Sequence, residues 1–531
     1  MNAEILIDRP EGNDLAAGVV AGSPEALRYF AHDWRDLAGY RARAGAIDPD
    51  DTGWLEAVRA HGEVAERRKE ELARRGGFVV TTGQQPGLFS GPLFTIYKAL
   101  TAVRLAEELE AELERPVVPL FWIAGEDHDW EEAHHTHLVG VDNELHRVEV
   151  AEVEGAGRDA LWRVELGTAG LNAVARLREI LPPTDFSESL FATLEEAYGE
   201  GATLPSGFER CMAEYLAPRG VLFVSAHDPA LKARSRGILR RAVEEAEAHE
   251  TALSARAREL DGEGLPVQVP ILEGGLNLFV DGSSGRERVY RDGTGFALRH
   301  SGRRFTREAL LTLLDDEPDR VTPNVLLRPV VESAVFPTVA YVAGPGELAY
   351  WGELAPLFDA LDVPMPVVHP RLGGTVIEGK VRKVLDKFGV TLDQLALPAH
   401  ELASELARDE MPDEVRAVLG RIRGAIGQGS SELTEAVRAL DPTLKGPIGS
   451  ARGAAFEAFA EAEKKILQAV KREQEIALQQ IGKARLHLRP DGRPQERVLN
   501  VSYYLARFGP SFLDAVYDAM PNALPSAMTR T

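Results

Sequence analysis

The sequence contains a single cysteine, Cys211, among its 531 residues. One thiol cannot form an internal disulfide framework or a multi-thiolate zinc site, so both kinds of stabilisation are excluded. Cys211 lies in a stretch of helical character between Phe208 and Met212. We interpret it as a buried structural cysteine rather than a reactive one.

Long apolar runs and an excess of basic residues are absent as well. The most apolar run, Val117 to Gly125, is far shorter than the roughly 18 residues that a membrane helix needs. The start of the sequence lacks the basic and then apolar pattern of a signal peptide. A formal net charge of −23 repels nucleic acids and anionic membranes. We therefore expect a soluble cytoplasmic protein that binds neither nucleic acid nor membrane.

What the sequence does contain is an ordinary globular composition. Hydrophobic residues make up 44% and charged residues 27% of the chain, which excludes a mostly disordered protein. At about 150 residues per domain, the length suggests roughly three to four domains.

A βαβ unit is predicted early in the chain. Residues 78–82 are rich in β-formers, and a turn rich in glycine and proline follows at residues 83–92. Apolar residues at helical spacing predict a helix over about 93–114, and an almost uninterrupted apolar strand follows at 117–124. Apolar strands of this kind are typical of a parallel sheet that is covered on both faces.

Three later segments are predicted as further buried strands of the same sheet: 221–225, 338–343 and 365–368. The stretches between them have a different texture, with antiparallel strands expected over 265–280 and 288–291 and a turn at Asp281–Gly282. The predicted domains are an N-terminal helical layer (1–77), the first part of a Rossmann-like core (78–139), an insertion (140–215), a core strand and helix (216–239), a second insertion (240–320), the last part of the core (321–399), an antiparallel coiled-coil arm (400–488) and a C-terminal segment that packs on the core (489–531).

The predicted arm rests on a heptad pattern. Apolar residues alternate by four and three over the first helix, with one longer gap, at Val415, Leu419, Ile422, Ile426, Leu433, Val437, Leu440 and Leu444. A break is expected at Asp441–Pro442 and Lys445–Pro447, and a second helix at about 454–488, where Glu463 and Glu473 interrupt the heptads. The hairpin either docks on its own core or forms a dimer arm, and we favour the homodimer.

The glycine-rich turn is the first candidate for chemistry. Gln84, Gln85, Gly87 and Gly91 lie in a turn that opens a helix, where backbone N–H groups favour a phosphate or a carboxylate. Lys98 follows at a distance from which its side chain reaches such an anion. The pattern is neither a Walker A motif nor a dinucleotide fingerprint. The alternative is a tight turn with a solvated lysine.

An acidic segment around a histidine is the second candidate. Residues 125–132 carry five carboxylates around His128, directly after the apolar strand. His128, flanked by Asp127 and Asp129, suits a general base that takes a proton from an attacking amine. Two alternatives are a metal site that also uses residues 134–137, although the spacing matches no zinc signature, and a solvated acidic loop.

The remaining candidates follow the later strands. The residues concerned are Asn324 and Arg328, then Gly344, Gly346, Glu347 and Tyr350, and finally His369 and Arg371. Arginines at these places suit carboxylates or phosphates, and a glutamate in a first helical turn suits a substrate ammonium. A structural ion pair, aromatic core packing and a structural histidine are the respective alternatives. Because ligands of open α/β sheets bind beyond the carboxyl ends of strands, we expect Gln84, His128 and Arg328 to share one small-molecule cavity.

Several long motifs resemble those of the bacillithiol-biosynthesis cysteine-adding enzyme family (BshC). They are TTGQQPGLFSGPLFTIYK, VPLFWIAGEDHDWEE, PNVLLRP, TVAYVAGPGELAYW, MPVVHPR and QERVLN, in this order and over essentially the whole chain. The resemblance implies a Rossmann-like core similar to class I aminoacyl-tRNA synthetases, with inserted connecting-peptide regions and a coiled-coil arm for dimerisation. The HIGH and KMSKS signatures of those synthetases are absent.

The resemblance also implies a reaction, the last step of bacillithiol synthesis, in which a ligase joins cysteine by an amide bond to the amine of glucosaminyl malate. His128 with Asp127 or Asp129 is then expected to accept the amine proton, and Arg328 and Arg371 to hold carboxylates. The turn with Lys98 binds a phosphate if ATP with Mg²⁺ activates the cysteine, or the malate carboxylates if it does not. No tightly bound metal is expected.

Three other functions stay open from the sequence. One is a metal-dependent hydrolase built on the Asp127–His137 cluster, and the second is a nucleotidyl-transfer enzyme that acts on another small substrate. The third is a non-enzymatic dimeric scaffold built on the coiled coil.

Overall fold

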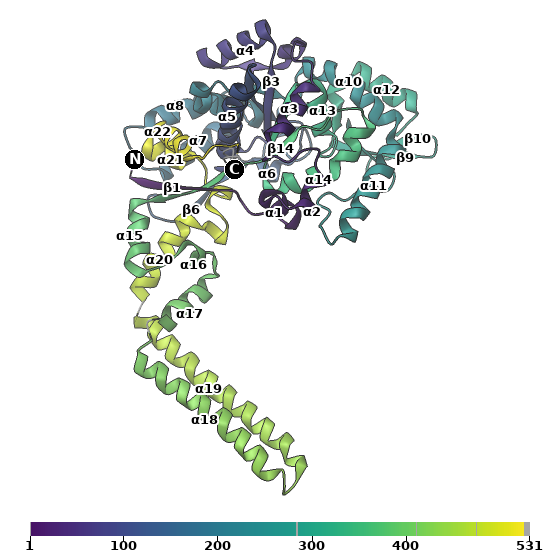
Figure 1. Cartoon of the computed structure of the whole chain (residues 1–531). Coiled ribbons are helices and arrows are strands. Elements are labelled where there is room, and N and C mark those ends of the chain that lie inside the picture. Colours follow the sequence, from purple (N-terminus) through teal and green to yellow (C-terminus); the bar gives the residue numbers. More distant parts are fainter. Residues whose placement is uncertain (1, 283–284, 410, 474, 525–531) are drawn as a thin grey trace, which may run out of the picture. The chain divides into compact units, whose positions relative to one another are not determined.

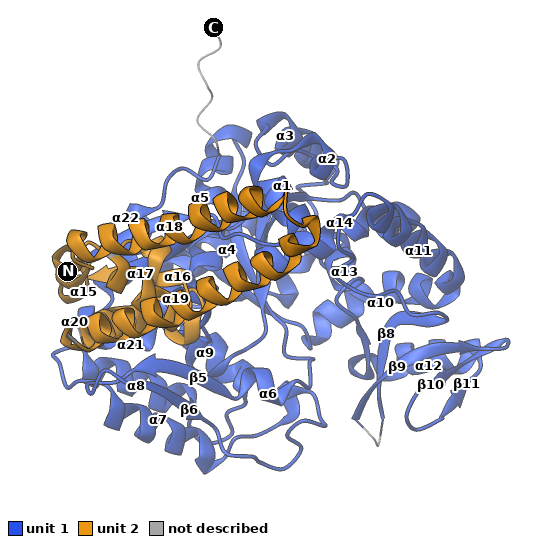
Figure 2. Cartoon of the chain, turned by 90° about the horizontal axis from the view of Figure 1, so that it is seen from below, with its two compact units in different colours: residues 1, 3–376, 495–531 blue, residues 2, 377–494 orange. Residues whose placement is uncertain are grey.

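The computed structural model describes residues 2–282, 285–409, 411–473 and 475–524. These residues form two compact units, drawn in different colours in Figure 2. The first unit contains residues 3–376 and the described part of the C-terminal segment from Gln495, and the second contains Asn2 and residues 377–494. The predicted arm started at residue 400, whereas the second unit starts at 377.

A six-stranded sheet forms the centre of the first unit (Figure 1). Its order is β14 (Val367–Pro370), β13 (Thr338–Ala343), β3 (Phe78–Gln84), β4 (Val117–Ile123), β7 (Leu222–Ser225) and β2 (Arg59–Ala60). The first five strands run parallel, and β2 pairs antiparallel with β7 at the edge. This arrangement confirms the α/β class and the parallel core that the apolar strands predicted.

The order of the strands creates a switch point in the sheet. From β3 the chain adds β4 and β7 on one side, and it later returns to add β13 and β14 on the other side. Ligands of open parallel sheets bind where the strand order reverses, beyond the carboxyl ends of the strands. In this chain that place lies between the ends of β3 and β13.

Burial explains why these segments form central strands. Every residue of β4 and of β13 is buried, as expected for strands covered on both faces. Helix α5 (Phe94–Leu113) connects β3 to β4 and packs against both. It starts at the carboxyl end of β3 and therefore carries Lys98 to that edge of the sheet.

The insertions surround this core. The first holds the hairpin of β5 (His135–Val139) and β6 (Leu145–Glu149), followed by α7 (Thr168–Ile180), α8 (Ser187–Ala197) and α9 (Leu204–Leu216). The second follows α10 (Pro229–Glu244) and holds α11 (Ala246–Gly262), α12 (Arg307–Asp316) and a five-stranded sheet of order β11 (Arg304–Phe305), β10 (Gly295–Leu298), β9 (Gly285–Asp292), β8 (Gly275–Gly282) and β12 (Val321–Pro323).

The predicted strand over 265–280 was wrong in its first half. The strand β8 begins only at Gly275, because Pro266 and Pro270 have no N–H group for a ladder. The turn predicted at Asp281–Gly282 was also wrong, since both residues belong to β8 and Gly282 pairs with Gly285.

Further elements complete the first unit. They are β1 (Ala3–Asp8), α1 (Asp14–Ala21), α2 (Pro24–Leu27), α3 (Leu37–Gly45), α4 (Glu63–Arg75), α6 (Trp130–Ala133), α13 (Arg328–Val335), α14 (Pro345–Ala360), α21 (Ser502–Phe508) and α22 (Ser511–Ala519). The strand β15 (Gly373–Glu378) leads into the second unit.

The second unit is helical, and two long helices run side by side in it (Figures 1 and 2). Its helices are α15 (Gly379–Phe388), α16 (Leu392–Ala396), α17 (Ala399–Asp409), α18 (Asp413–Val437), α19 (Lys445–Glu473) and α20 (Glu475–Leu488). The break predicted at Lys445–Pro447 instead opens α19, since proline is tolerated in a first helical turn.

The heptad interruption at Glu463 has a partner in the facing helix, because Arg423 of α18 forms an ion pair with it. No described residue of α18 is buried, and apolar residues such as Ile422 and Leu433 are exposed along it. The homodimer stays a prediction. Among the described residues, no helix combines the length and the apolar character that crossing a bilayer requires.

Candidate functional site

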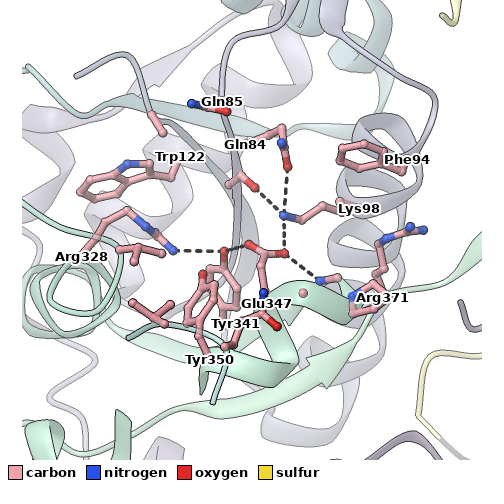
Figure 3. Close-up of a pocket in the computed structure, with 18 of the residues that line it drawn as sticks. Gln84, Gln85, Phe94, Lys98, Trp122, Arg328, Tyr341, Glu347, Tyr350 and Arg371 are labelled. Atoms are coloured by element: carbon pink, nitrogen blue, oxygen red, sulfur yellow. Dashed lines mark hydrogen bonds and ion pairs between the residues drawn. The ribbon is translucent and has the colours of Figure 1, made fainter. Parts of the chain in front are cut away.

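A cavity of about 540 Å³ opens at the switch point of the sheet (Figure 3). Strands β3, β4 and β13, the start of α5, and the starts of α13 and α14 all contribute to its walls. Nine of the residues that the sequence singled out line it: Gln84, Gln85, Lys98, Arg328, Gly344, Gly346, Glu347, Tyr350 and Arg371. Segments that are far apart in the sequence therefore meet at one rim, as the strand-end argument predicted.

Lys98 forms the centre of the cavity floor. Its side chain is 1% exposed, and Nζ lies 2.6 Å from Glu347 Oε2 and donates to the carbonyl oxygen of Gly83 at 2.5 Å. Burial lowers the pKa of Lys98, although Glu347 opposes the shift. The carboxylate of Glu347 also accepts from the Tyr341 hydroxyl at 2.5 Å and from Gly344 N at 2.7 Å. Lys98 thus ties the β3 turn to the start of α14.

Arg328 occupies the opposite wall and also has an internal carboxylate partner. Its Nη1 donates to Glu332 Oε2 at 2.7 Å and its Nη2 to the Tyr341 hydroxyl at 3.2 Å. The guanidinium lies 5.7 Å from the centre of the Trp122 ring. Glu332 is 1% exposed, and Thr81 donates to it at 2.5 Å. The structural ion pair that was the alternative interpretation of Arg328 is therefore present. Arg328 nevertheless lines the cavity.

A third buried ion pair closes the rim. Arg371 donates to both carboxylate oxygens of Glu496, at 2.8 and 2.5 Å, and the two side chains are 2% and 7% exposed. The Nε atom of Arg371 has no hydrogen-bond partner among the described residues. Arg497, the next residue after Glu496, lines the cavity, is exposed and forms no ion pair within the described part of the chain.

Aromatic and open surfaces complete the cavity. Phe94, Trp122 and Tyr350 line it, and the indole N–H of Trp122 has no partner among the described side chains and backbone. A Cβ atom added at Gly346 would meet no atom within 4 Å. Gly346, the second residue of α14, therefore faces open space. The backbone N–H groups at the N-terminus of this helix lie beside that space and favour an anion.

Sequence reasoning missed a glutamate that holds one wall in place. Glu353 of α14 is 1% exposed, and its Oε1 accepts from the backbone N–H groups of Gln268 and Val269 at 2.8 and 3.1 Å. Both of these residues line the cavity. Glu353 lies six residues after Glu347, but nothing in the local sequence marks it, because its partners are more than 80 residues away.

This glutamate carries a testable pH dependence. Burial raises the pKa of Glu353 from 4.5 to about 7, although the two backbone N–H groups oppose the shift. A carboxyl with a raised pKa stabilises the fold at low pH, and the stabilisation is lost as pH rises through that value. We expect wild type to lose about 1–3 kcal/mol relative to Glu353→Gln between pH 5 and pH 8. Urea unfolding of both proteins at the two pH values measures this difference, and parallel pH profiles would contradict it.

His128, Asp127 and Asp129 do not line this cavity. They line a second cavity of about 750 Å³ together with Trp130 and His134. The two sites are linked, because Gln85 Nε2 donates to Asp127 Oδ2 at 2.6 Å. Although burial opposes the shift, the contacts of Asp127 with His128 and Arg286 lower its pKa to about 2. The predicted common cavity thus holds for Gln84 and Arg328 and is wrong for His128.

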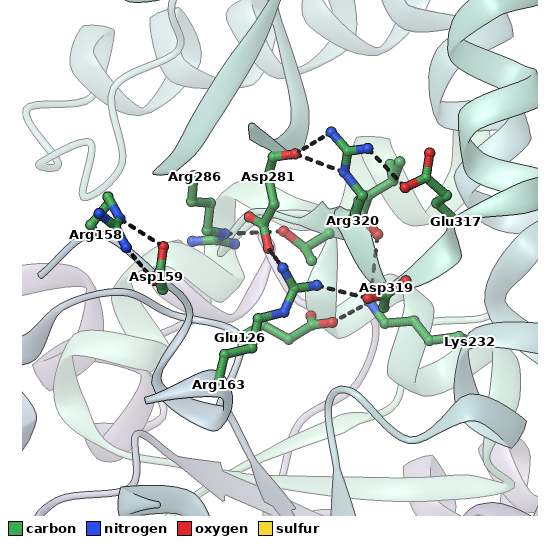
Figure 4. A network of polar contacts seen from close by, with 12 residues as sticks. Glu126, Arg158, Asp159, Arg163, Lys232, Asp281, Arg286, Glu317, Asp319 and Arg320 are labelled. Atoms are coloured by element: carbon green, nitrogen blue, oxygen red, sulfur yellow. Dashed lines mark hydrogen bonds and ion pairs between the residues drawn. The ribbon is translucent and has the colours of Figure 1, made fainter. Parts of the chain in front are cut away.

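The five carboxylates of the acidic segment do not converge on one point. Glu126 is buried and forms an ion pair with Lys232 of α10, within the network of Figure 4. Asp129 caps α6 by accepting from Glu132 N at 3.0 Å, and Glu132 lines the cavity at the switch point. Among the described residues, no group of three or more His, Cys, Asp or Glu side chains is arranged to hold a metal ion.

Four predicted binding residues lie outside the cavity and have structural partners. The Asn324 side chain accepts from Leu326 N and Leu327 N at 3.0 Å and so fixes the turn that precedes α13. His369 is fully buried, with Nδ1 2.8 Å from the Tyr40 hydroxyl. Gly91 adopts a φ of 67°, which favours glycine, and its neighbour in the turn, Gly87, does not reach the cavity.

Comparison with known proteins identifies the family. The model of the bacillithiol biosynthesis BshC N-terminal Rossmann-like domain matches residues 13–372, and that of the BshC C-terminal coiled-coil domain matches residues 374–525. The protein named "Putative cysteine ligase BshC" in Salinibacter ruber is 37% identical over 93% of this chain and 91% of its own length. Proteins of the same name are 32% identical in Chlorobaculum tepidum, over 85% and 82%, and 31% identical in Symbiobacterium thermophilum, over 93% and 92%.

A likeness to a solved structure is much weaker. An arginyl-tRNA synthetase of Thermus thermophilus aligns over 98% of this chain and 95% of its own with 12% identity and a TM-score of 0.19. The similarity to class I synthetases therefore stays a prediction. The two domain models together span nearly all of the chain, and the chain therefore belongs to the BshC family of bacillithiol biosynthesis, with its Rossmann-like and coiled-coil domains.

Proposed function

We propose that this protein is a ligase that joins the carboxyl group of cysteine to the amine of glucosaminyl malate, the last step of bacillithiol synthesis. Family membership supports the reaction class. The cavity at the switch point supports this location, because residues of all six family-like motifs meet there. Its volume of about 540 Å³ is in the range of small-molecule sites.

The walls suggest how two polar substrates are held. Arg497 and the free N–H groups at the start of α14 offer positive charge for the malate carboxylates. Glu347 lies at the same rim and suits the cysteine ammonium, while Phe94 and Tyr350 give apolar contact to the sugar and the cysteine side chain. The buried ion pairs of Lys98, Arg328 and Arg371 fix the positions of these groups and are preorganised before substrate binds.

The proton acceptor in this proposal is Glu132 rather than His128. In the reaction the glucosamine nitrogen attacks the activated carboxyl carbon, the leaving group departs, and the nitrogen loses a proton. Glu132 lines the cavity, and burial together with Asp129 and Asp127 raises its pKa, which makes it a better base. His128 faces the neighbouring cavity.

The choice of Glu132 over His128 as proton acceptor predicts different rates of amide formation for two variants. We expect Glu132→Gln to lower kcat by about 10²–10⁴, the usual contribution of a general base, with little change in KM. His128→Ala is expected to retain kcat within about tenfold, because it acts only through the Asp127–Gln85 contact. Steady-state rates of amide formation test both, and a total loss in His128→Ala with an active Glu132→Gln would reverse the assignment.

How the cysteine carboxyl is activated is a separate hypothesis. ATP with Mg²⁺ is the candidate, but the cavity offers it little uncompensated positive charge, because Lys98, Arg328 and Arg371 are each paired with a carboxylate. Family membership also favours a ligase over the metal-dependent hydrolase, the nucleotidyl-transfer enzyme and the scaffold.

The deciding experiment is reconstitution with cysteine and glucosaminyl malate, with and without ATP and Mg²⁺. Mass spectrometry follows bacillithiol, AMP and ADP. We expect product from the two substrates under at least one condition, with a nucleotide product in proportion if ATP is used. The absence of product under every condition, with folded protein, would contradict the proposed reaction.

A further inference from the structure

A third cavity lies at the opposite end of the sheet from the proposed active site. It has a volume of about 370 Å³ and is bounded by the end of α3, the segment before β13 and the segment before β14. Because β13 has six residues at about 3.3 Å each, the two cavities are separated by about 20 Å. The site is therefore independent of the proposed reaction.

Arg43 is the charged group that distinguishes this cavity. Arg43 is 3% exposed, and its Nε donates to the carbonyl oxygen of Thr338 at 3.0 Å. Within the described part of the chain, it forms no ion pair with a carboxylate. Burial lowers the pKa of Arg43 to about 10, and no neighbouring charge offsets the shift. A buried cation without a counter-charge is costly, which points to an anion that the protein itself does not supply.

The second polar group is a hydroxyl without a partner. Ser333 lines the cavity, is 7% exposed, and its Oγ has no hydrogen-bond partner among the described residues. A serine hydroxyl donates readily to an oxyanion. Arg43 and Ser333 thus provide a cation and a neutral donor, both more than nine-tenths buried, on the wall of one cavity.

The other charged groups around the cavity are either paired or exposed. Asp51 pairs with Arg234 at 2.7 Å, and Arg241 pairs with Glu245 at 3.0 Å and with Asp362 at 3.3 Å. Asp48 is exposed at the surface. The rest of the wall is largely apolar and includes Ile47, Trp54, Ile238, Val335, Phe336 and Leu361.

From these observations we propose that the cavity is a binding site for a small organic oxyanion, a carboxylate with a short apolar body. The carboxylate pairs with Arg43 and accepts from Ser333, and the apolar walls cover the body of the ligand. The volume excludes large ligands, and the walls favour a carboxylate over inorganic phosphate, which has no apolar part. This assignment does not depend on the ligase reaction.

Thermal unfolding of the full chain with butyrate and with inorganic phosphate, at constant ionic strength, tests the proposal. Ligand that binds only the folded state raises Tm, and saturating butyrate is expected to raise it by about 2–4 °C. Phosphate is expected to give a smaller shift. No shift with either anion would overturn the site, and a larger shift with phosphate would replace the carboxylate by phosphate as its ligand.

Three variants locate the binding. Arg43→Gln is expected to abolish the butyrate shift, and without ligand it should be at least as stable as wild type because it removes an uncompensated charge. Arg41→Gln is the matched control, since Arg41 lies on the same helix but pairs with Glu112 at the surface, and it should keep the full shift. Ser333→Ala leaves the charge in place and is expected to weaken butyrate binding about tenfold in calorimetry. A shift retained in Arg43→Gln would place the binding elsewhere and overturn the proposal.

Discussion

The variant Lys98→Met is expected to be about 3–5 kcal/mol less stable than wild type and to form no detectable amide product. The loss of stability follows from Glu347, which would remain in the cavity floor as a carboxylate without its cation. The loss of activity follows because Lys98 holds the Gly83 carbonyl and Glu347 together, so both the β3 turn and the start of α14 lose their position. Urea unfolding and the reconstituted reaction measure the two effects.

A double variant separates stability from activity. In Lys98→Met/Glu347→Gln the uncompensated charge is gone. The amide oxygen can still accept from Gly344 N, and the amide NH2 group can donate to the Tyr341 hydroxyl. We expect most of the stability to return and the activity to stay at least a hundredfold below wild type. Recovery of activity together with stability would show that Lys98 supports only the fold.

The second large effect is expected at the buried ion pair of Arg371 and Glu496. Glu496→Leu leaves Arg371 as an unpaired buried cation, and we expect a loss of about 3–5 kcal/mol in the free energy of unfolding. Arg371→Met/Glu496→Leu replaces both charges by apolar groups of similar size, and its stability should return to near that of wild type.

Activity in this double variant tests whether Arg371 also serves the substrates. Its Nε has no partner among the described residues and faces the region of Gly344. We expect KM for glucosaminyl malate to rise about tenfold while kcat changes little, as for the loss of one charged contact in binding. An unchanged KM would assign Arg371 to the fold alone.

Much of the fold could be predicted because its signals are local. The strands β3, β4 and β13 are continuous apolar runs, and each is followed by glycine or polar residues, which together indicate a buried parallel sheet. Since the carboxyl ends of such strands share an edge, the meeting of Gln84, Arg328 and Glu347 in one cavity could be predicted as well.

The pairing of charges could not be predicted from the sequence. Glu496 is 125 residues from Arg371, and Glu353 is 85 residues from Gln268. No local pattern encodes such partners, because they depend on how distant elements pack. The same limit explains why the sequence predicted anion binding by Lys98 and Arg328 and left an ion pair open only for Arg328, whereas each has a carboxylate beside it.

The directions in which the side chains of the acidic segment point could not be predicted from the sequence either. Its five carboxylates suggested one shared site around His128, but the chain turns there and its residues point in different directions. Glu126 faces Lys232 in the interior, Asp127 and His128 face a neighbouring cavity, and Glu132 faces the switch point. Adjacent residues in a loop and a short helix do not share one direction.

The central claim is that the substrates react in the cavity at the switch point, and Gly346→Leu tests it most directly. Gly346 lines that cavity with no atom within 4 Å of an added Cβ, so leucine would fill the cavity without disturbing the packing. Gly237→Leu is the matched control, because Gly237 is an exposed glycine of α10 with equally open surroundings. We expect both variants to have the same midpoint of urea unfolding as wild type. Gly237→Leu should remain fully active. Gly346→Leu should form the amide at least a hundredfold more slowly, which corresponds to a rise of about 3 kcal/mol in the activation free energy. Wild-type activity in a folded Gly346→Leu protein would contradict the account.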